Sequence, residues 1–219
     1  MSKLFELTGP TAGPLHDGSP RHLVILLHGY GANGDDLIGL APVWAPLLPD
    51  TLFVAPNAPY PCDMNPYGFQ WFDISNLNPD IMLEGARAVA PTLDAYLTAE
   101  MARHGLDESK TALVGFSQGT MMALHVGLRR AQPFAGIIGF SGALPGAAAL
   151  KDEIKSRSPV LLVHGDADPM VPVQAMRLAQ QGLEAVKVAV EAHVSPGLEH
   201  GIDQMGLELG AGFLKKVLA

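Results

Sequence analysis

The sequence predicts an α/β fold with a doubly wound, mostly parallel sheet flanked by helices, and the order of its apolar segments carries this prediction. Short apolar runs typical of strands buried on both faces alternate with longer segments whose apolar residues recur at the helical period. Strands that alternate with helices imply βαβ crossovers. With 219 residues, 48% hydrophobic and 16% charged, the chain is expected to fold as a single domain, residues 1–219, with a sizeable core.

The expected elements follow in order along the chain. The first strand, 22–27, is a continuous apolar run after a loop at 9–20 rich in Gly, Pro, Ser and Asp. Later strands are expected at 52–55, 112–116, 137–140, 160–164 and 186–194. Helices are expected at 79–104, 118–130, 173–182 and 202–218. Pro91 should kink or interrupt the first helix.

Residues 56–78 depart from this alternation. The segment is long, rich in proline and aromatic residues, and carries neither clear period. Loops of this length in compact domains are usually functional or mobile. The alternative is a surface excursion whose aromatic side chains pack on the helices, and the sequence favours neither.

The overall composition argues against several classes of function. A net charge of -8 argues against nucleic-acid binding, which needs clustered Lys and Arg. The single cysteine, Cys62, allows no intrachain disulfide and no Cys-based zinc site, which fits a reducing compartment. Residues 1–9 lack the apolar core of a signal peptide, and the run at 23–27 is too short to span a bilayer. A cytoplasmic protein without stable membrane insertion is therefore expected.

The strongest chemical signal is Gly-Phe-Ser-Gln-Gly at 115–119, between an expected buried strand and a helix. A serine on so tight a turn is tolerable only when the residues two positions away lack a Cβ, as Gly115 and Gly119 do. This placement exposes the hydroxyl beside the amides of a helix N-terminus. The pattern predicts that Ser117 is a nucleophile, and a serine nucleophile needs a neighbouring base.

Two acids compete as the residue that orients this base, both on the loop after the strand 160–164. Pro169 forces Asp168 into an extended conformation at the end of the strand. Asp166 follows Gly165 directly and suits a turn-stabilising role. Asp168 is therefore predicted to be the catalytic acid and Asp166 a structural one.

Two histidines compete as the base. His200 lies on a loop before the last helix, at the sheet edge where Ser117 is expected. His193 alternates with Lys187 and Glu191 on one side of its strand, as a half-exposed strand residue would. His200 is the predicted base. The spacing of the remaining histidines does not suggest metal ligation, so no metal site is expected.

An oxyanion hole is predicted from two backbone amides. His-Gly-Tyr-Gly at 28–31 follows the first strand, and its glycines let the backbone turn its amides toward the serine. The expected donors are the N–H groups of Tyr30 and Gln118. His28 is interpreted as a buried, hydrogen-bonded residue that shapes the loop.

Together these motifs resemble the phospholipase/carboxylesterase family of α/β hydrolases, over nearly the whole chain. The matching segments are LHGYG at 27–31, WFDI at 71–74, GFSQG at 115–119, HGDADPMVP at 164–172 and HG at 200–201. The resemblance implies an α/β-hydrolase fold without a separate cap domain, a Ser117–Asp168–His200 triad, oxyanion amides at Tyr30 and Gln118, and no cofactor. Relatives often dimerise, so a homodimer is one expectation.

The expected reaction is acyl transfer from a small-molecule carboxylic ester of short to medium chain length. Trp71, Phe72, Leu144 and Met170 are hypothesised to line an acyl channel, because apolar side chains at the loop edge must face something. Alternatives are a lysophospholipase, an acyl-protein thioesterase, another enzyme class on the same scaffold, or a non-catalytic binding protein. The family commonly has Leu where this chain has Tyr30, which should change the pocket wall and leave a backbone donor intact.

Overall fold

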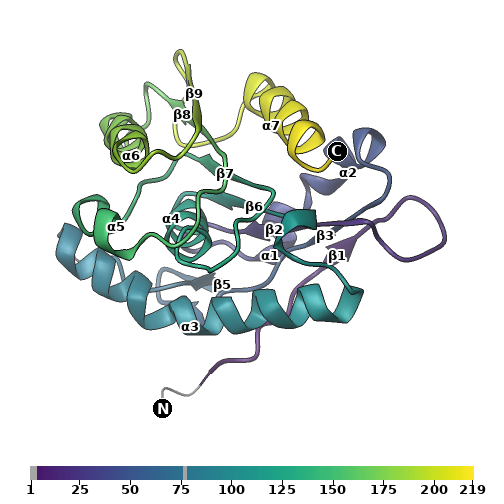
Figure 1. The fold of residues 1–219 in the computed structure, drawn as a ribbon. Helices are drawn as coiled ribbons and strands as arrows, with labels where there is room; N and C mark the ends of the chain where they lie inside the picture. Colours follow the sequence, from purple (N-terminus) through teal and green to yellow (C-terminus); the bar gives the residue numbers. More distant parts are fainter. Residues whose placement is uncertain (1–3, 76–77) are drawn as a thin grey trace.

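The computed structural model describes residues 4–75 and 78–219. Within these residues, a seven-stranded sheet in the order β1-β3-β2-β6-β7-β8-β9 forms the centre of the molecule, with helices on both faces (Figure 1). β1 is antiparallel to β3, and the other neighbouring strands are parallel. The strands are β1 Thr11–Ala12, β2 His22–Leu27, β3 Thr51–Val54, β6 Thr111–Phe116, β7 Gly136–Phe140, β8 Val160–Gly165 and β9 Val190–Ser195.

Side chains that alternate along each strand build two layers of core, one on each face of the sheet. In β2, Leu23, Ile25 and Leu27 pack with the layer under α3 Pro79–His104, α4 Gln118–Gly127, α5 Ala147–Glu153 and α6 Gln174–Ala185. Val24 and Leu26 pack with α1 Gly34–Ile38, α2 Ala41–Trp44 and α7 Gln204–Val217 on the other face. Strands buried on both faces explain why they read as continuous apolar runs. The predicted doubly wound α/β class is confirmed, and no separate cap domain appears in residues 4–75 and 78–219.

Most predicted elements are present with shifted ends. Strand β9 begins at Val190 and not at 186, because α6 extends to Ala185 and Lys187 then takes a φ of 62° in a turn. Helix α4 ends at Gly127, three residues before its predicted end. Helix α3 continues uninterrupted through Pro91 and ends where Gly105 adopts a left-handed conformation.

Several short elements were not predicted. They are β1 inside the expected loop 9–20, the helices α1, α2 and α5, and the 3₁₀ turns η1 Ala45–Leu47 and η2 Glu108–Lys110. Helix α1 has five residues, and its start is fixed by a capping box in which Asn33 and Asp36 bond each other's backbone amides. Elements this short do not complete enough turns to show a period.

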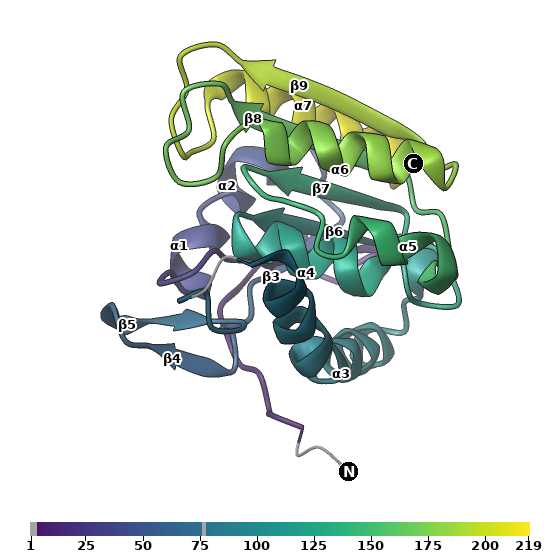
Figure 2. The ribbon, with the colours of Figure 1, turned by 90° about the vertical axis from the view of Figure 1, so that its left-hand side faces the viewer.

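The segment 56–78 contains an antiparallel hairpin, β4 Tyr60–Cys62 with β5 Asn65–Gln70. Its end, Asn76 and Leu77, lies outside the described residues. The hairpin projects beside α1, on the side toward which the arrowheads of β7 and β9 point (Figure 2). A bridge between Ala32 and Phe69 joins it to the loop after β2. In the residues described, the segment therefore forms a hairpin at the carboxyl edge of the main sheet.

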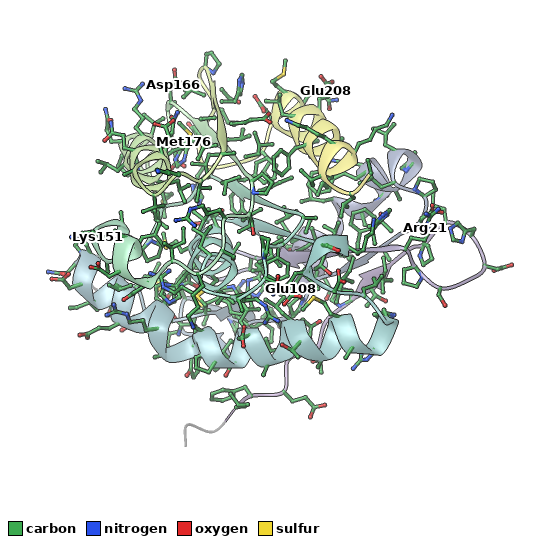
Figure 3. All side chains as sticks on the ribbon, in the orientation of Figure 1. Arg21, Glu108, Lys151, Asp166, Met176 and Glu208 are labelled. Atoms are coloured by element: carbon green, nitrogen blue, oxygen red, sulfur yellow. The ribbon has the colours of Figure 1, made fainter. Side chains whose placement is uncertain are left out.

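The side chains follow this layering (Figure 3). Met176 of α6 is buried in the core, whereas Asp166 is exposed on the loop after β8. In residues 4–75 and 78–219, none of the helices combines the length and hydrophobicity required to cross a membrane. The loops after β2, β6, β8 and β9 all leave the same edge of the parallel sheet, which brings the predicted site residues to one rim.

Candidate active site

Ser117 lies on a strained turn between β6 and α4. Its φ of 53° and ψ of -115° lie in a region that residues other than glycine rarely adopt, at a cost of about 1–3 kcal/mol. A Cβ at Gly119 would lie 1.8 Å from the carbonyl oxygen of Leu27, and a Cβ at Gly115 would lie 2.3 Å from the amide nitrogen of Thr120. The two glycines are therefore needed for close packing of this turn, and the predicted tight turn at Ser117 is confirmed.

Asp168 is a buried carboxylate with a full set of donors. Its Oδ1 accepts hydrogen bonds of 2.8 Å from the amides of Met170 and Val171, and its Oδ2 lies 2.7 Å from Nδ1 of His200. Burial alone would raise the pKa of this carboxyl group, but the bonds from His200, Val171 and Met170 outweigh it and hold the pKa below its ordinary value. The group is therefore ionised at neutral pH.

His200 is held through one ring nitrogen. Because the carboxylate of Asp168 can only accept, Nδ1 of His200 carries the proton in their bond, and Nε2 of the neutral ring is left as a proton acceptor. The ring packs against Phe116, the residue before Ser117, with centroids 4.9 Å apart. The side chain stays 20% exposed. This arrangement gives an oriented base whose Nε2 has no hydrogen-bond partner among the described residues.

Ser117 and His200 line the same cavity, of about 300 Å³. Tyr30, Gln118 and Met170 also line it. The rest of the wall is mostly apolar and consists of Gly29, Ala32, Ile74, Met82, Phe116, Met121 and Val171. The cavity thus combines a hydroxyl group, an imidazole and an apolar wall.

The loop after β2 is held by the fully buried ring of His28. Nε2 of this ring accepts from the amide of Ala58 at 2.9 Å, so Nδ1 carries the proton and donates to the carbonyl of Gly29 at 2.7 Å. Burial lowers the pKa of His28, which keeps the ring neutral. The interpretation of His28 as a residue that shapes the loop is confirmed. Gln118 is the first residue of α4, so its amide has no acceptor within the helix.

Asp166 and His193, the alternatives to Asp168 and His200, make different contacts. Asp166 accepts a bond of 2.6 Å from the amide of Gly197, which fixes the loop leading to His200. Its role is therefore structural, although the bond crosses between loops and is not a local turn. His193 is half-buried in β9, where it pairs with Val163 of β8.

The sequence model of the phospholipase/carboxylesterase family matches residues 16–218. The chain belongs to the phospholipase/carboxylesterase family. It is a carboxylic ester hydrolase of the esterase type.

Several relatives resemble the esterase over most of its length. Esterase YpfH of Escherichia coli (strain K12) is 28% identical over 201 residues, which are 91% of this chain and 84% of that protein. Acyl-protein thioesterase 1 of Gibberella zeae is 28% identical over 213 residues, covering 89% of this chain and 90% of that protein. The crystal structure of esterase PE8, 44% identical, matches with a TM-score of 0.94 and covers 98% of this chain and 100% of that one.

The hypothesised acyl channel needs correction at three of its four residues. Met170 lines the cavity of the esterase and is 69% exposed, as expected for a wall residue. Trp71, Phe72 and Leu144 are instead buried in the core layer under α3 and α4, and the described residues that line the cavity do not include them. Apolar residues near the loop edge can face inward as well as outward, and their positions in the sequence do not distinguish the two.

The apolar wall is supplied by residues that the sequence did not single out for this role. Met82 and Met121 lie near the starts of α3 and α4, and Ile74 and Val171 lie on loops. Met82 belongs to the apolar period of α3, so its pattern resembles that of a core residue. Its position within the first turn of the helix is the only signal that could have placed it at the rim.

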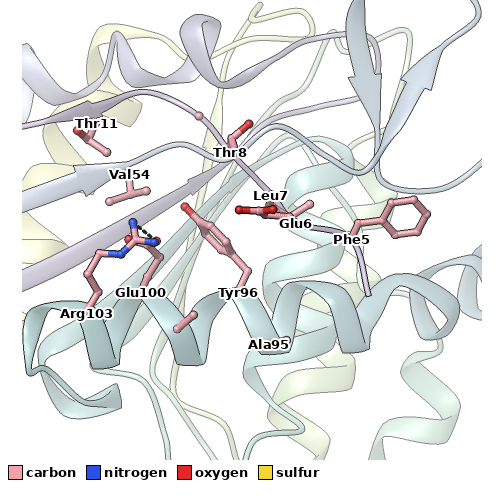
Figure 4. Close-up of a pocket in the computed structure, with 12 residues that line it drawn as sticks. Phe5, Glu6, Leu7, Thr8, Thr11, Val54, Ala95, Tyr96, Glu100 and Arg103 are labelled. Atoms are coloured by element: carbon pink, nitrogen blue, oxygen red, sulfur yellow. Dashed lines mark ion pairs between the residues drawn. The ribbon is translucent and has the colours of Figure 1, made fainter. Parts of the chain in front are cut away.

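A larger cavity, of about 420 Å³, lies between the N-terminal segment and the second half of α3 (Figure 4). Glu100 there is buried and pairs with Arg103 at 2.9 Å. Burial and the nearby Glu100 carboxylate raise the pKa of Tyr96. The described residues lining this cavity include no serine and no histidine, so it lacks the groups that the cavity beside Ser117 brings together.

Proposed function

We propose that this esterase hydrolyses short- to medium-chain carboxylic esters through a Ser117–His200–Asp168 triad and an acyl-enzyme. The observation that carries the proposal is the 2.7 Å bond between His200 Nδ1 and Asp168 Oδ2, made at a cavity that Ser117 and His200 share. A serine on a strained turn, beside an oriented imidazole with a free nitrogen, is the arrangement that acyl transfer requires.

In the proposed acylation step, Nε2 of His200 accepts the proton of the Ser117 hydroxyl as its Oγ attacks the ester carbonyl. The carbonyl π electrons move to the oxygen, and the resulting oxyanion accepts from the amides of Tyr30 and Gln118. Loss of one such donor in other enzymes costs about 3–4 kcal/mol of barrier. The imidazolium, stabilised by Asp168, then protonates the leaving alkoxide as the C–O bond breaks.

Deacylation repeats these steps with water. His200 takes a proton from the water molecule as its oxygen attacks the acyl carbonyl. The bond between the acyl carbon and Ser117 Oγ then breaks, and the proton returns to that oxygen. The products are a carboxylic acid and the free enzyme.

The cavity wall supports the proposed acyl length. It is mostly apolar, and its volume of about 300 Å³ lies at the lower limit of small-molecule sites, which is about 300–1,000 Å³. An acyl chain of a few carbons fits this space better than a long lipid chain.

The second candidate is an acyl-protein thioesterase, favoured by the similarity to the acyl-protein thioesterase 1 of Gibberella zeae. The chemistry at Ser117 would be the same, and only the leaving group would differ. Lysophospholipid hydrolysis differs in the same limited way. A panel of short aryl esters, acylated peptide thioesters and long-chain lysolipids separates the three by kcat/KM.

The triad is tested by Ser117→Ala. This variant should lose ester hydrolysis and labelling by a fluorophosphonate probe, while its circular dichroism and Tm remain those of a folded protein. Turnover above the buffer rate in purified Ser117→Ala would overturn the assignment.

The compartment is also proposed. Cys62 is free and buried, as expected for a protein in a reducing compartment, and this supports a cytoplasmic location.

A further inference from the structure

We propose that Trp71 is a positioning residue of the oxyanion hole, an inference that rests on the proposed function. Its indole Nε1 donates to the carbonyl of His28 at 3.0 Å, and its backbone amide donates to Oε1 of Gln118 at 2.9 Å. His28 lies two residues before Tyr30, and Gln118 is the other proposed donor residue. One residue thus ties together the two backbone segments whose amides must point at the same oxygen.

Two hydrogen bonds connect the Gln118 side chain to the main chain at 71–72. The carboxamide of Gln118, which is 1% exposed, also donates from Nε2 to the carbonyl of Phe72 at 2.7 Å. Its two ends are therefore both satisfied by the main chain at 71–72. Phe72 in turn packs on α3 at Gly85, where a Cβ would lie 2.8 Å from the Phe72 ring. The start of α4 is thereby fixed to the chain that follows the hairpin.

The link to the other amide is equally rigid. The Trp71 and His28 rings lie with centroids 5.7 Å apart, and the His28 ring bonds the carbonyl of Gly29 and the amide of Ala58. Trp71 itself is fully buried. The carbonyl of His28 is therefore held from one side by the indole, while the ring of the same residue holds the next peptide.

This bracing matters because an oxyanion hole works only when its donors lie about 2.7–3.1 Å from the oxyanion. Loss of the indole N–H leaves both amides present but loosens their spacing. Since complete removal of one donor costs about 10²–10³-fold in kcat, we expect a smaller loss, of about 10-fold. KM should stay unchanged, because the described residues that line the cavity do not include Trp71.

The second tryptophan supplies a matched control. Trp44 is also fully buried and also donates its indole N–H to a backbone carbonyl at 3.0 Å, that of Leu207. It lies in the core layer on the other face of the sheet. Trp71→Phe and Trp44→Phe remove the same bond from similar surroundings, so both should lower Tm by similar amounts.

Only Trp71→Phe should lower kcat, with KM unchanged, and it should weaken inhibition by an alkyl boronic acid by a similar factor. The boronate forms a tetrahedral adduct on Ser117, and its oxygen uses the same amides. Wild-type kcat and boronate affinity in Trp71→Phe would overturn the proposal, as would an equal loss of kcat in Trp44→Phe. If Trp71→Phe does not fold, Gln118→Met removes the opposite end of the link, with kcat and boronate affinity as its readouts; KM is not one of them, because Gln118 lines the cavity.

A measurement on the unaltered protein completes the test. The chain has two tryptophans, so its ¹H–¹⁵N spectrum contains two indole signals. The Trp71 signal should shift when the boronate adduct forms, and the Trp44 signal should not. An unmoved Trp71 signal at full occupancy would contradict the bracing role. Activity retained in Ser117→Ala would instead overturn the proposed function itself, so the two failures are distinguishable.

Discussion

Two histidines close to the strand ends at the site are held in different ways. His200, on the loop after β9, is bonded at one ring nitrogen by Asp168, on the loop after β8. His28, on the loop after β2, is bonded at both ring nitrogens, by the carbonyl of Gly29 and by the amide of Ala58 in the segment after β3. The two rings also differ in burial, because the His200 side chain is 20% exposed and His28 is fully buried. Of these two histidines, only His200 lines the cavity with Ser117, and only its Nε2 is left without a hydrogen-bond partner among the described residues.

This difference separates two ways of building a site. The side with His200 and Asp168 offers reactive side chains, so its polar atoms must stay available to substrate or to each other. The side with His28 and Trp71 offers backbone amides, and its side chains serve to hold the backbone in place. Substitutions on the first side should therefore affect chemistry more than stability, and substitutions on the second side should affect both.

The largest effect is expected from His200→Ala. Removal of a triad base in other hydrolases lowers kcat by about 10⁴–10⁶-fold, and a similar loss is expected here. Because the ring is partly exposed and bonds only Asp168 among the described residues, Tm should fall by a few degrees at most. Steady-state kinetics on a short aryl ester, with a parallel thermal melt, checks both expectations. A variant that keeps a tenth of wild-type kcat would remove His200 from the mechanism.

The second-largest effect is expected from Asp168→Asn, which should lower kcat by about 10³–10⁴-fold because an amide cannot hold the imidazole in the required tautomer. The pKa of Asp168 is held below its ordinary value, so its carboxylate stabilises the fold above about pH 4 and loses that contribution as pH falls through the lowered pKa. Acid unfolding of wild type and Asp168→Asn, followed by circular dichroism, should therefore converge at low pH. Asp166→Asn is the control, since Asp166 bonds the loop amide of Gly197 and not His200.

The sequence predicts the residues on the His200 side of the site better than those on the Trp71 side. Asp168 and His200 could be predicted because each follows a strand of the sheet, and parallel strands bring their carboxyl ends to one edge. The bracing role of Trp71 could not be predicted, because it depends on contacts with His28 and Gln118, 43 and 47 residues away in the chain.

The same limit applies to the fold. Long strands and helices carry a clear period, and the parallel sheet followed from their alternation. The hairpin β4–β5 and helix α1 are too short for a period and depend on bonds to distant segments, such as the amide of Gly34 bonding Asn57. The prediction of the wall residues failed for a related reason. Met82 and Met121 belong to helices in which most of the other large apolar residues pack in the core, so the pattern does not distinguish them.

The His28→Gln variant tests the structural role of His28 through its effect on the free energy of unfolding. Loss of buried hydrogen bonds should lower the free energy of unfolding by about 1–3 kcal/mol, with a smaller loss of kcat than at His200. Burial lowers the pKa of His28. In the unfolded chain this imidazole is protonated as the pH falls below about 6.5, whereas in the folded chain it stays neutral at that pH. Stability of the wild type should therefore fall as pH decreases below about 6.5, and Gln, which does not titrate, should remove part of this slope.

Denaturant melts of wild type and His28→Gln between pH 7.5 and 5.5 measure this difference. Other histidines contribute to both curves, including His125, whose pKa burial lowers to about 4. Their contribution cancels in the comparison of the two proteins. Equal slopes in wild type and variant would show that the His28 ring does not stay neutral in the folded state.

The smallest effect is expected from Tyr30→Leu, which changes the side chain at a position where only the backbone is proposed to act. A hydrogen bond with Cys62, with burial and the nearby Asp63 and Asp73, raises the pKa of the Tyr30 phenol to about 12, so the phenol is neutral and takes no part in acid–base chemistry at neutral pH. For a short aryl ester, kcat should change less than about threefold, or about 0.7 kcal/mol of barrier.

The Tyr30 side chain nevertheless lines the cavity, so Leu should shift the ratio of kcat/KM between short and medium acyl chains. Tyr30→Phe, which keeps the ring and removes the hydroxyl, separates the wall from the bond to Cys62. If Tyr30→Leu and Tyr30→Phe both lose more than about 100-fold in kcat, the phenol itself acts in the reaction. The side of the site with His28 and Trp71 would then also use a reactive side chain, and its contrast with the side of His200 and Asp168 would no longer hold.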